Sequence, residues 1–356
     1  MAGLHNPHAR DLQRSSTLVD RLELMFDWYK GMVDQRTGRL LYLYDPEHEL
    51  AISDHQSIRD IAAVWDVEVL STFLERNDLA GPIRHSLAHF DQQVIGRDGY
   101  AIVAPKAAAS SIASSAFLTL ALARSDLPDK VQRLTPLADG ILHQQRPDGS
   151  YRVFFDEEPD SGEELYPAEA MLALLETHRL TGDPRYLDSA ERGFTHYKRD
   201  YYDHGHLDPD LLVFFANWQS QTGRALYAAT SRPEVKELVP AFLFELHDRV
   251  IYSGFYDHVA SRPEQQACVK VACGLEGLAD AYAIAASIGD HRTAHYRQYI
   301  KTALGFLVQA QRITDCAGRE RGGFGASLAD REQRIDVTGH VASGFIKSIE
   351  NGITEP

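Results

Sequence analysis

The sequence predicts an all-α fold in which six helical hairpins close into a toroid, an (α/α)6 arrangement. Two observations carry this prediction. Apolar helical stretches of about three to five turns follow one another along the chain, and the linkers between them are alternately short and long. Such self-similarity is a stronger fold signal than any single motif. Because no linker rich in Pro, Ser and Gly interrupts the pattern, we expect one domain over residues 1–356.

The hairpins predict two sets of helices with different surroundings. Outer helices are expected near residues 16–34, 80–95, 128–145, 184–201, 233–250 and 292–312. Inner helices are expected near residues 56–76, 108–124, 164–181, 208–222, 264–288 and 336–351. Outer candidates carry charges along one face, whereas inner candidates, such as 168–175, are apolar nearly all round. A helix that is apolar on every face is buried on every face, so the inner six should lie inside the outer six.

The turn at residues 181–184 illustrates how one helix ends and the next begins. Gly182 suits the left-handed conformation that ends a helix, Asp183 can cap the next helix, and Pro184 fits its first turn. Similar short turns should lie together on one face of the ring. The long linkers and the N-terminal ends of the inner helices then gather at the opposite face, here called the mouth. Helix N-termini favour anionic or hydroxyl-rich ligands, so we expect the chemistry there.

Composition limits the function classes. The chain has 36 basic and 51 acidic residues, a net charge of −15 and 44% apolar residues. Without a cluster of Lys and Arg, it lacks the concentrated positive charge that favours nucleic acid or anionic membranes as partners. No run of about 18 apolar residues is present to span a bilayer.

The cysteines and the start of the chain bear on location. Cys268, Cys273 and Cys316 make an odd number without zinc-type spacing, which does not suggest a disulfide framework. The first residues contain no apolar leader segment. We therefore expect a cytoplasmic protein in a reducing compartment.

Glu169 is the most informative polar residue, because it lies one turn into an otherwise apolar inner helix. A buried carboxylate without partners is costly, so Glu169 either has a hydrogen-bonded structural role or borders a wet cavity. Tyr166 lies three residues earlier on the same stripe, and Glu164 precedes the helix. We predict that all three belong to a site, with an Arg pair or backbone capping as the structural alternative for the acids.

The first inner helix carries three polar residues on one stripe. They are His55, Arg59 and Asp66, and Asp54 precedes them at the mouth. Arg59 is a natural partner for a carboxylate of the ligand, and equally for Glu169. We predict that these four residues bind substrate.

The last inner helix offers Asp336 and His340, one turn apart. An Asp at this spacing can fix the tautomer of a His and raise its basicity, as a general base requires. The alternative is that Asp336 caps the helix and His340 is a satisfied core histidine. Glu276 is another carboxylate on an apolar inner helix and is a further candidate for the site.

The long linkers add polar and aromatic candidates for substrate binding. Asp208, Asp257 and His258 stand before inner helices, although Asp208 can also be a helix cap. Tyr151 and Phe324 belong to a group of aromatic residues expected at the mouth, where such rings can stack against sugars. The His- and Asp-rich segment 203–210 fits no familiar zinc spacing, so we expect no metal.

Two short segments resemble a known group of enzymes. Residues 164–170 (ELYPAEA), followed by residues 180–187 (LTGDPRYL), resemble the (α/α)6 toroid enzymes that act on carbohydrates. This group includes six-hairpin glycosidases, N-acylglucosamine 2-epimerases and glucuronyl C5-epimerases. The resemblance implies a small-molecule or oligosaccharide substrate, and we expect no cofactor. It supports the fold more strongly than the reaction, because fold does not fix function.

Four functions stay open at this point. The first is glycoside hydrolysis by two carboxylates, Glu169 and Asp336, with Glu164 or Glu276 as substitutes. The second is epimerisation of a sugar or uronate, with His340 or His55 as base and Arg59 as substrate anchor. The third is a non-catalytic toroid that binds a glycan or a protein. The fourth is tailoring of a peptide or terpenoid natural product.

Overall fold

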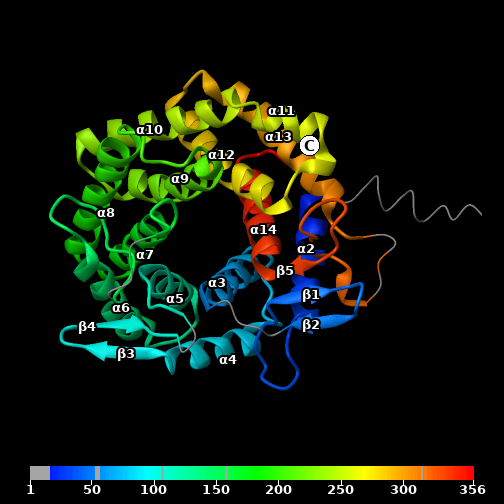
Figure 1. Ribbon diagram of the computed structural model, residues 1–356, viewed down its shortest axis with the longest axis horizontal. Helices are drawn as coiled ribbons and strands as arrows, with labels where there is room; N and C mark the ends of the chain where they lie inside the picture. The colour runs from blue at the N-terminus through cyan, green and yellow to red at the C-terminus, as the bar shows by residue number, and fades with distance from the viewer. Residues whose placement is uncertain are drawn as a thin grey trace, which may run out of the picture.

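The computed structural model describes residues 17–52, 57–105, 108–156, 159, 161–313, 316 and 318–356, which form two concentric rings of helices (Figure 1). The outer ring contains α2 (Leu18–Gly31), α4 (Ala80–Asp91), α6 (Lys130–Gln144), α8 (Pro184–His196), α10 (Pro233–Tyr252) and α13 (Arg292–Ala310). The inner ring contains α3 (Ser57–Phe73), α5 (Ile112–Arg124), α7 (Tyr166–Thr181), α9 (Leu212–Ala229), α12 (Cys268–Ile288) and α14 (Ile335–Glu350). Each inner helix packs against the next, and α14 packs against α3. The predicted (α/α)6 toroid is confirmed.

The inner helices are buried as their composition predicts. In α5, every residue from Ile112 to Ala123 is buried. The longest inner helix, α12, is long and apolar enough to cross a membrane, but 78% of its most apolar window is buried inside the ring. It also carries two buried acids, Glu276 and Asp280. We therefore interpret α12 as a core helix.

The turn between α7 and α8 has the predicted geometry. Gly182 ends α7 with a left-handed φ of 71°. The Asp183 carboxylate then accepts a hydrogen bond from the Arg185 N–H at 3.0 Å, and Pro184 occupies the first turn of α8. Because the short turns join inner to outer helices, the six inner helices run parallel and their N-terminal ends share one face.

Short strands in the long linkers were not predicted. Antiparallel β1 (Leu43–Asp45) pairs with both β2 (Leu50–Ile52) and β5 (Gln333–Arg334). This sheet joins the first and last long linkers, and β5 leads directly into α14, so it fixes where α14 begins. A second hairpin joins β3 (Val94–Arg97) to β4 (Tyr100–Val103) through the Asp98-Gly99 pair, which is a hairpin-turn signal in the sequence.

Irregular helices account for the main differences from the predicted boundaries. After α8 the chain continues as a π-helical turn, Tyr197–Tyr202, where a longer outer helix was expected. The predicted inner helix 208–222 begins instead with a 3-10 turn, Pro209–Leu211, before α9. An additional short helix, α11 (Phe255–Ser261), packs against α10 and α13 at the outer ring. Two further 3-10 turns lie in the last long linkers, Pro263–Gln265 and Gly318–Glu320.

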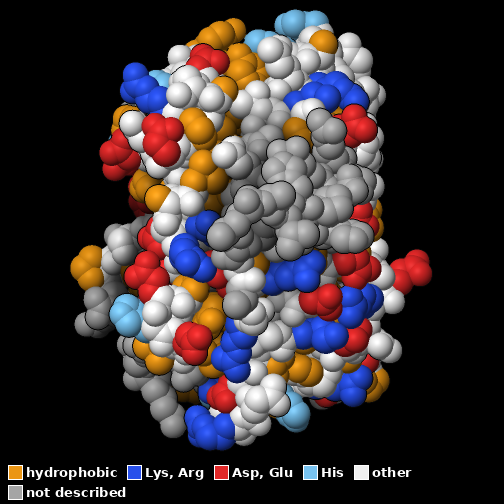
Figure 2. Space-filling model, turned by 90° about the vertical axis from the view of Figure 1, so that its right-hand side faces the viewer, with side chains coloured by type: hydrophobic (Ala, Val, Ile, Leu, Met, Phe, Trp, Pro, Cys, Tyr) orange, Lys and Arg blue, Asp and Glu red, His pale blue; other side chains and the backbone are white. Residues whose placement is uncertain are grey.

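Acidic and basic side chains intermingle on the outer surface. Figure 2 shows this on the side of the ring that includes α2 and α13. Pairs of neighbouring opposite charges recur around the ring, for example Arg76 with Glu23 at 2.6 Å and Arg292 with Asp248 at 2.9 Å. Ion pairs at the surface contribute little stability each, so the fold depends on its apolar inner layer.

Candidate active site at the mouth of the toroid

A cavity of about 400 Å³ opens at the N-terminal ends of the inner helices, where the sequence predicts the site. Its size is within the range of small-molecule sites. Polar side chains on its wall are Arg59, Ser114, Tyr166, Glu169, Arg334, Asp336 and His340. Apolar side chains on its wall include Phe117, Leu165, Leu211, Phe214, Trp218 and Val269. The cavity therefore combines a few convergent polar groups with aromatic walls.

The helical spacing places these side chains together. Tyr166 and Glu169 are three residues apart in the first turn of α7, and both face the cavity. Asp336 and His340 are four residues apart at the start of α14 and also face it. Arg59 approaches from the first turn of α3. Three parallel helices thus direct acidic and basic groups into one space.

Glu169 is a buried acid that faces the cavity. It is 4% exposed, and its Oε2 atom has no hydrogen-bond partner in the described part of the chain. Burial raises the pKa of Glu169 to about 8, although the charges of His340 and Arg59 partly oppose this shift. At neutral pH Glu169 is therefore an uncharged carboxylic acid that can donate a proton.

Asp336 lies between two guanidinium groups. Its Oδ2 atom accepts hydrogen bonds from Arg59 at 3.1 Å and from Arg334 at 2.7 Å, and its Oδ1 atom accepts one from Arg334 at 3.0 Å. The N-cap position of α14 belongs to Arg334, so the capping alternative for Asp336 is wrong. The two arginines compensate the charge of a carboxylate that is 8% exposed.

His340 forms a dyad with Glu276 of α12. The imidazole Nδ1 atom lies 2.7 Å from Glu276 Oε2, which also accepts a hydrogen bond from Asn217 at 3.1 Å. Burial lowers the pKa of His340, but the neighbouring Cys273 and Glu276 outweigh burial and raise it well above its usual range. The prediction that Asp336 fixes the His340 tautomer is wrong, because the Nδ1 partner comes from a different helix.

The dyad and the neighbouring Cys273 carry side chains of the types that bind metals. Potential ligand atoms of Cys273, Glu276 and His340 lie within 4.8 Å of one another. However, Glu276 is already paired with His340, and the Lys347 ammonium lies 3.9 Å from its Oε1 atom. Burial also raises the pKa of the Cys273 thiol, which disfavours the thiolate that a metal requires. We therefore assign no metal to this cluster.

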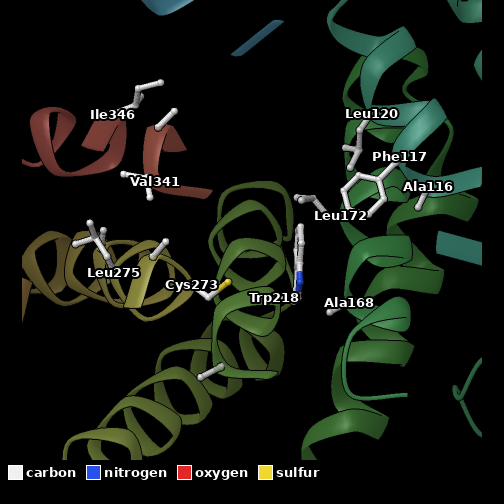
Figure 3. Close-up of a cluster of buried hydrophobic side chains, with 14 of the residues drawn as sticks. Ala116, Phe117, Leu120, Ala168, Leu172, Trp218, Cys273, Leu275, Val341 and Ile346 are labelled. Atoms are coloured by element: carbon white, nitrogen blue, oxygen red, sulfur yellow. The ribbon is translucent and has the colours of Figure 1, made fainter. Parts of the chain in front are cut away.

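Apolar side chains close the bottom of the cavity. Phe117 of α5, Leu172 of α7 and Trp218 of α9 converge there (Figure 3). The Phe117 and Trp218 rings pack edge to face, with their centroids 5.7 Å apart. Beyond this floor lies a second cavity of about 350 Å³, here called the rear cavity. The rear cavity is lined by Trp65, Asp66, Leu172, Arg224, Asp280 and Lys347, among others.

Three predicted acids lie near the mouth cavity but not on its wall. Glu164 precedes α7 and accepts a hydrogen bond from the Tyr201 hydroxyl at 3.0 Å. Asp66 lines the rear cavity, and burial raises its pKa to about 8. Glu276 lies behind His340. Asp54 and His55 fall outside the described residues.

Five predicted linker residues are corrected by the structure. Tyr151 and Phe324 are fully buried core residues, and the Tyr151 hydroxyl bonds Ser189 Oγ at 2.8 Å. Asp208 is exposed and caps the 3-10 turn, where it accepts a hydrogen bond from the Asp210 N–H at 2.9 Å. Asp257 and His258 are exposed on α11 at the outer ring. Aromatic linker residues filled the core, and polar ones faced solvent.

The wall residues that were not predicted include Phe117, Trp218 and Arg334. Phe117 and Trp218 look like ordinary core residues of apolar helices, so only their three-dimensional positions identify them. Arg334 had a local signal, because it stands two residues before Asp336 and reaches back to it.

Of the comparisons with known proteins, the one with solved structures supports the architecture. A scan against protein-family models matches no family, and a search of curated proteins gives no match. Among solved structures, the chain is similar to a sugar epimerase from a ruminal bacterium, with a TM-score of 0.72, 12% identity and coverage of 94% of this chain and 98% of that chain. It is also similar to cellobiose 2-epimerase from Spirochaeta thermophila, with a TM-score of 0.70, 12% identity and coverage of 99% and 100%.

A hydrolase shows the same likeness. An unsaturated glucuronyl hydrolase specific for heparin matches with a TM-score of 0.64, 9% identity and coverage of 94% of this chain and 97% of that chain. At these identities the likeness establishes the fold, and the resemblance to the six-hairpin toroids is confirmed at that level.

Proposed function

We propose that the protein is a carbohydrate-active enzyme, a glycoside hydrolase whose site is the mouth cavity. The observation that carries this proposal is the pair of acids in one cavity. Glu169 keeps its proton to about pH 8, while Asp336 forms ion pairs with Arg59 and Arg334. Glycoside hydrolysis needs one protonated acid and one ionised carboxylate on either side of the scissile bond.

Each group then has a role. Glu169 donates its proton to the glycosidic oxygen as the bond breaks. Asp336 supplies the ionised carboxylate that acts at the anomeric carbon, directly or through a water molecule. Trp218 and Tyr166 offer aromatic surface for a sugar ring. The solved proteins of similar fold are named for reactions of sugars, which agrees with this assignment.

Replacing Glu169 by Gln tests the proposal. The amide keeps the shape of the neutral acid but cannot donate a proton, so hydrolysis should fall by about 10²- to 10⁴-fold. Release of new reducing ends from a panel of glycosides and oligosaccharides measures this. Glu68→Gln is the matched control, because Glu68 is also a buried acid, with a pKa raised to about 9, but lies outside both cavities. Equal rates in wild type and Glu169→Gln would exclude Glu169 as the acid.

Epimerisation is the second candidate, favoured by His340, which lies on the wall of the same cavity and pairs with Glu276 behind it. In this reaction a base takes the proton from a sugar carbon next to a carbonyl and an acid returns a proton to the other face; neutral His340 would be the base and protonated Glu169 the acid. Incubation in deuterium oxide separates the two reactions. Epimerisation places deuterium on carbon in the recovered sugar, whereas hydrolysis gives new reducing ends without carbon-bound deuterium.

A further inference from the structure

Three inner helices carry a stripe of buried and half-buried polar residues that runs from the mouth toward the rear cavity. Glu276 and Asp280 are four residues apart on α12, and His340 and Lys347 are seven residues apart on α14. On α9, Asn217 and Arg224 have the same seven-residue spacing. These spacings keep each pair on one face of its helix.

Opposite charges alternate along this stripe. Below His340 and Glu276, the Lys347 ammonium lies 3.9 Å from Glu276 Oε1 and donates to Asp280 Oδ2 at 2.7 Å. The other Asp280 oxygen accepts a hydrogen bond from Arg224 at 2.9 Å. Since Glu276 and Asp280 are 2% and 1% exposed, neither has bulk water to stabilise its charge. Lys347 is the cation that lies between them.

Lys347 is separated from the mouth. It is in the last turn of α14, lines the rear cavity and has a side chain that is 15% exposed. Phe117 and Trp218 line the mouth cavity, Leu172 lines the rear cavity, and the three side chains lie together (Figure 3). A substrate in the mouth would therefore meet His340 but not Lys347.

We propose that Lys347 is a positioning residue that keeps Glu276 ionised and thereby holds the Nδ1 proton of His340 toward Glu276. An isolated buried carboxylate takes up a proton rather than remain charged, so Glu276 needs a second cation besides His340. Burial raises the pKa of Glu276, but His340 and Lys347 together outweigh burial and hold it below its usual range. With Nδ1 committed to Glu276, the orientation of the imidazole at the mouth is fixed.

Other ionisable groups also face the His340–Glu276 dyad, and their charges affect the pH at which it titrates. They are Arg59 and Asp66 from α3, Glu169 from α7, Cys273 and Asp280 from α12, and Asp336 from α14. Of the groups in contact with Glu276, Lys347 is the cation outside the mouth cavity. Its removal therefore changes the charge of the dyad without changing the cavity wall.

The test measures the titration of His340 by ¹⁵N NMR in the full-length protein. In wild type, the ring signals should respond on the acid side when Glu276 takes up a proton. In Lys347→Met this response should move upward by about one pH unit or more, because a charge at this separation interacts strongly in a buried site. Lys347→Arg should restore the wild-type midpoint. An unchanged midpoint in a folded Lys347→Met protein would overturn the proposal.

Lys198 provides the matched control. Its side chain is 13% exposed and it pairs with two carboxylates, Asp203 and Glu245, but at the outer ring. Lys198→Met should leave the His340 titration unchanged.

The catalytic consequence rests on the proposed function. Lys347→Met should lower kcat with little change in KM, and Lys347→Arg should recover it. If wild type turns over no glycoside but the NMR shift occurs, the proposed function fails and the role of Lys347 stands. If wild type is active and the NMR shift is absent, the proposed function stands and the role of Lys347 fails.

Discussion

Glu169→Gln should make the protein more stable at neutral and alkaline pH even though it removes the proposed acid. Glu169 is 4% exposed, and burial raises its pKa from 4.5 to about 8. The unfolded chain loses this proton near pH 4.5, whereas the folded protein keeps it to about pH 8. Within that window the folded state binds more protons, so its stability falls as the pH rises. The amide of Gln is neutral in both states and has no such dependence.

The magnitude follows from the width of the window. Each pH unit between the unfolded and folded pKa values removes about 1.4 kcal/mol of unfolding free energy. From pH 4.5 to about pH 8 the total is several kcal/mol. The stability that the raised pKa of Glu169 contributes is fully present below pH 4.5 and completely lost above about pH 8. This is a large part of the roughly 5–15 kcal/mol by which domains are stable.

Urea unfolding of both proteins at a series of pH values measures the effect. The unfolding free energy of Glu169→Gln minus that of wild type should grow with a slope of about 1.4 kcal/mol per pH unit and then level off. Contributions from Glu68 and Asp66, whose pKa values are also raised, are present in both proteins and cancel in the difference. A difference that stays flat with pH would refute the proposed protonation of Glu169.

Three further predictions concern the pH dependence of hydrolysis, Trp218 on the wall of the mouth cavity and Gly182 in the turn between α7 and α8. The hydrolytic rate should decrease as the pH rises through about 8, because Glu169 then loses its proton. A rate that increases there would indicate that Glu169 acts as a base. As the control, Asp66→Asn should keep the wild-type dependence of rate on pH. Trp218→Ala should raise KM for a sugar substrate by about tenfold through loss of aromatic contact, and an unchanged KM would remove Trp218 from the binding site. Gly182→Ala should destabilise by about 1 kcal/mol in thermal unfolding, because its φ is 71° and its surroundings are open. Gly81→Ala, in an equally open helical position, should be neutral or stabilising, and equal effects at both positions would contradict the turn argument.

The fold could be predicted from the sequence because its signals are local and repeated. Apolar periodicity located all twelve helices of the two rings, and the turn at Gly182 and Asp183 has the expected cap geometry. The short strands escaped because β1 and β5 pair across almost the whole chain. Residues in the first and last linkers contain no local sign that they meet.

The site could be predicted only where burial itself was the signal. A lone acid on an apolar inner helix is costly, so Glu169 stood out, and it lies on the cavity wall. The linker aromatics carried no comparable signal, because a ring such as Tyr151 fits a core as well as a binding site. The partner of His340 was also beyond local reasoning, since Glu276 is 64 residues away in the chain and comes from a neighbouring helix.

A crystal structure of Glu169→Gln with an oligosaccharide that the wild-type protein cleaves would show where the substrate binds. We expect a sugar ring in the mouth cavity against Trp218, with its glycosidic oxygen within hydrogen-bonding distance of the side chain at position 169. Sugar bound in the rear cavity or on the outer ring, with the mouth cavity empty, would show that the mouth cavity is not the active site.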